Sequence, residues 1–214
     1  MDEEIPIINS STREERVKNF FVKNKNKIIS IISALVLIVF SFFFYQEYRE
    51  GNREKLANKY NLAIAEYNNG DKSKITLLMK EIIADKDSTY SPLALYFLID
   101  NKILISKEEI NKYFNQIINE VKLDKEIKNL VIYKKALFNS DFETENNLLK
   151  ILDPVIKSDS VWKSHSFYLL AEFYLNNNQK QKAKEFYQQI INLKTSNRDI
   201  IIEAKKRLQS EYSE

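Results

Sequence analysis

The chain has 214 residues, a formal net charge of +3 and 29% charged residues. Because lysine and arginine are nearly balanced by aspartate and glutamate, charge gives no reason to expect a nucleic-acid-binding surface. Cysteine is absent, which excludes disulfides, thiolate metal ligands and the lipid-bearing cysteine of a bacterial lipoprotein. Only two glycines and three prolines occur, and this scarcity of helix breakers predicts an all-α protein.

Residues 1–27 form a tail whose second half is basic. Val17, Phe20 and Phe21 recur at helical spacing among cations, which favours a short amphipathic helix lying on the membrane surface. The sequence leaves open a simpler alternative, in which this stretch only extends the next helix toward the N-terminus.

Residues 28–45 are the most apolar stretch of the chain. Its 18 residues carry no charge, and 13 of them are Ile, Leu, Val or Phe. As a helix it would span about 27 Å, close to the ~30 Å hydrocarbon core of a bilayer. We therefore predict a single transmembrane helix rather than a buried helix of a soluble domain or a cleaved signal peptide. We expect Lys27, Phe40, Phe44 and Tyr45 to anchor its two ends at the membrane surfaces.

The charges beside this stretch predict its orientation. Six Lys or Arg residues lie within fifteen residues before it, and four lie within fifteen residues after it. The excess of positive charge before the span predicts a cytoplasmic N-terminus. Residues 46–214 would then be periplasmic, in a protein of the bacterial inner membrane.

Residues 46–214 contain a repeat. The tetrapeptide Gln-Ile-Ile-Asn occurs at 116–119 and again at 189–192. The distance between the two copies is about twice a repeat unit of 34 to 38 residues. The tetratricopeptide pattern of paired helices fits this length. In that register the helix A signature position holds Ala63, Leu98, Ala136 and Ala171, and the helix B position holds Ile75, Ile110, Leu148 and Ala183.

This register predicts an α-solenoid of about four helical hairpins, closed by a capping helix at roughly 198–212. Turns are expected at 68–71 and 176–178, and Ser106 with Glu109 forms a helix-capping sequence. The third hairpin fits least well. Pro154 is expected to interrupt its second helix, and Lys135 occupies a position where a hydrophobic residue belongs. The alternative is a generic helical bundle with accidental periodicity.

A basic tail, one span and a tetratricopeptide-like domain together resemble the YfgM-type ancillary subunits of the SecYEG translocon. The resemblance is carried by the stretches 151–156 (ILDPVI), 161–163 (VWK) and 168–175 (YLLAEFYL). It implies the SecYEG translocon and a PpiD-like periplasmic chaperone as partners. Members of that family tend to have a glycine in the final hairpin turn, where this chain has Asn178.

The sequence offers no enzyme, metal or cofactor signature. The single histidine, His165, has no matched catalytic group nearby in the sequence, and the carboxylate clusters are typical of solvated helix faces. An enzyme using His165 is therefore the least favoured function.

The register also predicts a groove for a protein partner on the first helix of each hairpin. The same residues fit equally well as core between the helices, so both alternatives stay open. The groove residues would be Tyr60, Ile64, Tyr67, Leu95, Ile99, Tyr133, Leu137, His165, Tyr168 and Glu172.

These patterns predict a non-enzymatic, membrane-tethered protein interaction module ancillary to the Sec translocon. It would link the translocon to periplasmic chaperones or hold emerging chains, because tethering raises the local concentration of the array. The alternative is an envelope scaffold or regulator unrelated to secretion, acting through its cytoplasmic tail.

Overall fold

The structure, a computed structural model, describes residues 10–67, 70–104 and 106–212, with side chains from residue 14 onward. All regular secondary structure in these ranges is α-helical, as the sequence predicts. The chain divides into two compact units, Met1–Lys55 and Leu56–Glu214.

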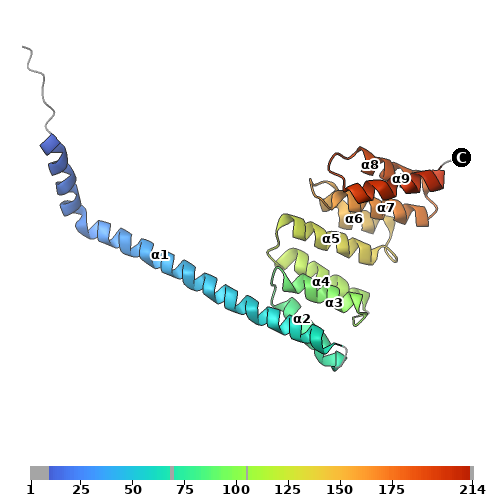
Figure 1. Cartoon of the computed structure of the whole chain (residues 1–214), viewed down its shortest axis with the longest axis horizontal. Helices are drawn as coiled ribbons and strands as arrows, with labels where there is room; N and C mark the ends of the chain where they lie inside the picture. Colours follow the sequence, from blue (N-terminus) through green and yellow to red (C-terminus); the bar gives the residue numbers. More distant parts are fainter. Residues whose placement is uncertain (1–9, 68–69, 105, 213–214) are drawn as a thin grey trace, which may run out of the picture. The chain divides into compact units, whose positions relative to one another are not determined.

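The first unit consists of most of α1 (Ser10–Glu66), one continuous helix of 57 residues. The basic stretch and the apolar stretch therefore share one helix, which matches the alternative of a helical extension. Figure 1 shows that α1 changes direction within its dark-blue N-terminal part. Every side chain from residue 29 to residue 45 is exposed, so the described residues leave the apolar surface of this stretch uncovered.

The second unit is an array of four helical hairpins followed by one further helix (Figure 1). The first hairpin pairs the C-terminal end of α1 with α2. The others follow in chain order, and the predicted capping helix is found with the predicted bounds. The helices are α2 (Lys72–Ala84), α3 (Tyr90–Asp100), α4 (Lys107–Glu120), α5 (Lys125–Asn139), α6 (Glu145–Ile156), α7 (Lys163–Asn176), α8 (Lys180–Asn192) and α9 (Arg198–Tyr212).

The predicted repeat register is confirmed by burial. Ala63, Leu98, Ala136 and Ala171 are each 0% exposed, and their helix B counterparts are exposed by no more than 1%. The repeated Gln-Ile-Ile-Asn segments end α4 and α8, which are both second helices of a hairpin. The alanines at these positions let neighbouring helices approach closely, and the leucines and isoleucines fill the space between helices.

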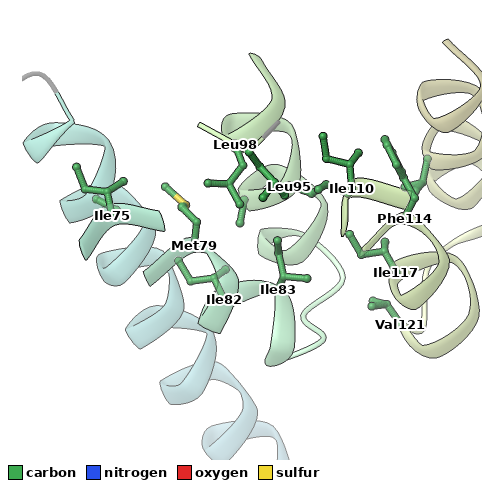
Figure 2. Close-up of a cluster of buried hydrophobic side chains, with 14 residues drawn as sticks. Ile75, Met79, Ile82, Ile83, Leu95, Leu98, Ile110, Phe114, Ile117 and Val121 are labelled. Carbon is green, nitrogen blue, oxygen red and sulfur yellow. The ribbon is translucent and has the colours of Figure 1, made fainter. Parts of the chain in front are cut away.

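Most buried apolar residues belong to two clusters, and each cluster has members on α5. The N-terminal core joins α1 to α5 and includes Leu98 and Val131. Figure 2 shows its centre, where side chains of α2 face Leu95 and Leu98 on one side and those of α4 follow beyond. The C-terminal core begins at Ala136 of α5 and continues to Ala204 of α9. Each cluster is built from successive hairpins, as expected of a solenoid.

Local hydrogen bonds define the ends of the helices. Asp71 accepts a bond from the Ser73 backbone N–H at 2.8 Å and caps α2. Gly70, just before this cap, lies very close to the end of α1. A Cβ atom at this position would be only 2.6 Å from the Glu66 carbonyl oxygen. Asn178 ends the turn after α7 with a φ of 59°, a left-handed conformation that Asn tolerates better than most residues.

One expectation about the third hairpin was wrong. Pro154 does not interrupt α6, which runs on to Ile156, because only two residues follow it in the helix. Lys135, at its position in α5, donates a hydrogen bond from its Nζ atom to Asn115 Oδ1 at 2.8 Å. The capping sequence at Ser106 is half formed. Its Oγ atom accepts from the Glu109 backbone N–H at 3.2 Å, whereas the Glu109 carboxylate pairs with Lys80 at 2.6 Å.

Candidate protein-binding surface

The predicted groove residues at the N-terminal end of the array mostly pack inward. The Tyr60 ring lies 5.8 Å from the Tyr90 ring, and the Tyr67 ring lies 5.2 Å edge-on from Phe97. Leu95 is 0% exposed, so it belongs to the core and offers no surface to a partner. Tyr60 lies on α1 and Leu95 on α3, as the register predicts, whereas Tyr67 lies in the turn after α1. The exposure of each side chain depends on the neighbouring hairpin.

Two of the predicted residues offer real surface. Ile64 is 40% exposed and Leu137 is 43% exposed, whereas Ile99 is partly buried against the N-terminal core. Exposed aliphatic side chains can contribute apolar area to a protein interface. Ile64 and Leu137 are therefore the members of the predicted groove best placed to contact a partner directly.

An aromatic cluster joins α5 to the start of α7. Tyr133 stacks on Trp162 at 5.7 Å, and His165 lies 5.9 Å from Tyr133 and 5.0 Å from Trp162. Beside these rings is a hollow of about 350 Å³, lined by Val161, Trp162, His165, Thr195 and Asn197. Sequence reasoning noted Trp162 only as part of a motif, and its stacking on Tyr133 follows from the packing of one hairpin on the next.

The environment of His165 favours an uncharged ring. Burial lowers the pKa of the His165 imidazole, and the nearby Val161 backbone offsets only part of that effect. Its ring neighbours are Tyr133 and Trp162, which supply neither a carboxylate nor a nucleophile. The surroundings of His165 therefore support a packing role.

Glu172 and Tyr168 are held by the last helix. Glu172 accepts a hydrogen bond from the Tyr187 hydroxyl at 2.6 Å and pairs with Arg207 of α9 at 2.7 Å. Tyr168 packs against the Tyr187 ring at 5.8 Å and interacts with Arg207. Because the Glu172 carboxylate is already bonded to Tyr187 and Arg207, its role in this structure is to hold α9 against α7.

The tyrosines of this surface stay protonated at neutral pH. Burial raises the pKa of Tyr60, Tyr133 and Tyr168 above the ordinary tyrosine value. A neutral hydroxyl can both donate and accept a hydrogen bond. Such groups suit recognition of peptide backbone or polar side chains.

A second hollow lies between α4, α5 and α6, and the predicted groove did not include it. We call it the polar cleft; it encloses about 550 Å³. Its sequence signal is an asparagine at every fourth position of α4, which a search for aromatic surface overlooks. Its lining residues are Asn111, Asn115, Ile118, Asn119, Ile132, Lys135, Glu143, Asn147, Lys150, Ile151 and Pro154.

Residues 18–205 match the family described as tetratricopeptide repeat-like domain. The chain belongs to this family. The match covers most of the chain and agrees with the paired helices and the buried signature positions. Tetratricopeptide repeat-like domains are protein–protein interaction modules. A search of curated proteins and a search of solved structures each found no match.

The carboxylates of this tetratricopeptide repeat-like domain were also compared with the arrangement that a metal site needs. Within the residues that the structure describes, no three His, Asp or Glu side chains are grouped so that they could hold a metal ion. The carboxylates of Glu109, Glu145 and Glu172 instead pair with Lys80, Lys182 and Arg207.

The family match also includes the apolar part of α1. In the described part of the chain, α1 is the one helix long and apolar enough to cross a membrane, with a mean hydropathy of 2.7 over 18 residues. None of that window is buried. Phe40, Phe44 and Tyr45 are exposed by 60%, 77% and 60%, and Lys27 is exposed just before the apolar stretch.

Proposed function

We propose that this protein is anchored in the bacterial inner membrane by residues 28–45 and presents its tetratricopeptide repeat-like array to proteins in the periplasm. The observation that carries the proposal is the unburied apolar window of α1, which continues without a break into the first hairpin. The core helix of a soluble protein would be mostly buried. Eighteen uncharged residues in helical form match the thickness of a bilayer core.

Charge and aromatic residues support the orientation. Six basic residues precede the span and four follow it, which favours a cytoplasmic N-terminus. Lys27 can extend its ammonium group toward the cytoplasmic headgroups, while Phe40, Phe44 and Tyr45 sit at the opposite surface. Residues 46–214 then form the periplasmic domain.

We propose the Sec translocon as the site of action, with a PpiD-like chaperone or an emerging chain as the partner of the array. The support is the resemblance to YfgM-type subunits together with the family membership of the domain. A membrane anchor near a channel exit raises the effective concentration of the array, so moderate affinity is sufficient.

The absence of cysteine gives a direct test of topology. We expect a single cysteine introduced at Asn177, in an exposed turn, to react with a membrane-impermeant maleimide in intact spheroplasts. A cysteine at Lys18 serves as the control and should react only after lysis. Reaction of Lys18→Cys alone in intact spheroplasts would contradict the proposed orientation, and complete extraction of the protein by alkaline carbonate would contradict the anchor.

A partner test uses the exposed aliphatic residues. We expect translocon subunits and a periplasmic chaperone to co-purify with the chain in mild detergent, and Ile64→Glu/Leu137→Glu to lose the chaperone while melting normally. Leu77→Glu is the matched control, since Leu77 is 63% exposed on α2, outside the predicted groove. If neither component is recovered with the wild-type chain, the alternative of an envelope scaffold acting through its cytoplasmic tail gains support.

A further inference from the structure

We propose that the polar cleft between α4, α5 and α6 binds an extended segment of a partner protein that carries an acidic side chain beside branched aliphatic side chains. The inference rests on the proposed function only in taking the ligand to be a protein. It assigns recognition to a surface formed chiefly by the second helices of two hairpins, separate from the predicted groove.

The asparagines of α4 have the spacing of an extended peptide. Asn115 and Asn119 are four residues apart, or about 6 Å along a helix, and two residues of an extended chain span about 6.6 Å. An asparagine amide offers both a donor and an acceptor, as a peptide group does. No hydrogen bond to the Asn119 amide occurs within the described residues, so this side chain is available to pair with a peptide backbone.

Of the three α4 asparagines that line the cleft, the first is held by a hydrogen-bonded partner within the protein. The Asn111 and Asn139 side chains donate to each other, at 2.9 Å in both directions, and Asn139 is 0% exposed. This amide pair fixes the side chain of Asn111, which lines the cleft near the start of α4. From Asn111 to Asn119 the helix rises by about 12 Å, which accommodates about four residues of extended chain.

The cleft carries more positive than negative charge. Its charged lining residues are Lys135, Lys150 and Glu143, two cationic side chains and one anionic side chain. Lys135 is partly buried, and the bond from its Nζ atom to Asn115 Oδ1 uses one of three available protons. Glu143 already accepts from Asn147 at 2.8 Å. A carboxylate on the ligand would supply the missing counter-charge.

The cleft also has an apolar part. Ile118, Ile132 and Ile151 line it together with Pro154. Branched aliphatic side chains of the ligand can pack against these isoleucines.

The test selects ligands from random heptapeptides displayed on phage, with the full-length chain held in detergent micelles. We expect the enriched sequences to place Asp or Glu beside Val, Ile or Leu. The cleft variant Asn119→Ala/Lys150→Gln should bind the most enriched peptide at least tenfold more weakly in fluorescence anisotropy, with unchanged melting. Both side chains are exposed, so the variant leaves the core intact.

The matched control is Asn146→Ala/Lys128→Gln, which removes the same two groups from exposed positions of α6 and α5 outside the cleft. It should select and bind the same peptides as the wild-type chain. Failure to enrich any peptide, or equal binding by the cleft variant, would overturn the proposal. In that case the partner test with Ile64→Glu/Leu137→Glu can still succeed, so failure of the cleft is distinguishable from failure of the proposed function.

Discussion

At the scale of single residues, His165 makes a measurable pH-dependent contribution to the stability of the folded chain. Because burial lowers its pKa in the folded chain, the unfolded chain binds the proton more strongly. The stability that this group contributes is present above the ordinary histidine pKa and is lost as the pH falls through the lowered value. We expect the melting temperature to fall between pH 7.5 and pH 5.5, and His165→Gln to flatten that decline.

The assignment is unambiguous because the chain has one histidine. Its imidazole proton resonances report the pKa directly by nuclear magnetic resonance. A titration midpoint at or above the ordinary histidine value, or an unchanged pH dependence in His165→Gln, would contradict the buried, neutral ring.

The repeat could be predicted from the sequence, but the burial and the bonding partners of each side chain could not. The signature positions of Ala136 and Leu148 were predicted and are fully buried, because helix packing fixes them through spacing alone. Glu172 was predicted as a groove residue, although it bonds Tyr187 and Arg207. The pairing with Arg207 joins residues that are 35 positions apart in the chain, so a local sequence pattern cannot predict it.

At the scale of helices, α9 is docked through Glu172. Replacing Glu172 by Ala leaves the Tyr187 hydroxyl without its partner, and Tyr187 is 0% exposed. An unsatisfied buried polar group costs about 1 to 3 kcal/mol, so the free energy of unfolding should fall by about that amount. Urea unfolding measures the loss, and faster amide exchange in α9 would locate it.

The matched control is Glu203→Ala, also on a glutamate paired with a cation. Glu203 pairs with Lys206 at 2.7 Å on the exposed surface of α9, where solvent screening leaves an ion pair with little effect on stability. Equal destabilisation by Glu172→Ala and Glu203→Ala would show that α9 is not held by this carboxylate.

The position of the last helix could be predicted from its apolar pattern. The range 198–212 was predicted for the last helix and is found as α9. The expectation for Pro154 was wrong because its position within the helix was unknown. Pro154 lies two residues before the end of α6, so the hydrogen bond that it removes affects only the last turn, whereas a proline at the centre would kink or break the helix. The polar cleft was missed for a related reason, since α4 and α6 line the same hollow only once α5 has packed between them.

At the scale of the whole array, the presence of two cores predicts that a core substitution destabilises mainly the hairpins of its own core. Leu98 and Leu148 are both 0% exposed leucines, and they belong to the N-terminal core and the C-terminal core. Each leucine-to-alanine change should cost about 2 to 5 kcal/mol. Because solenoid hairpins contact mainly their neighbours, that cost is felt first within the same core.

Hydrogen exchange followed by mass spectrometry on the full-length chain measures this directly. We expect Leu98→Ala to accelerate exchange in α2, α3 and α4, and Leu148→Ala to accelerate it in α6, α7 and α8. The helix α5 contributes Val131 to one core and Ala136 to the other, so it should respond to both changes. A uniform acceleration across all hairpins in either variant would mean that the array unfolds as one cooperative body despite its two cores.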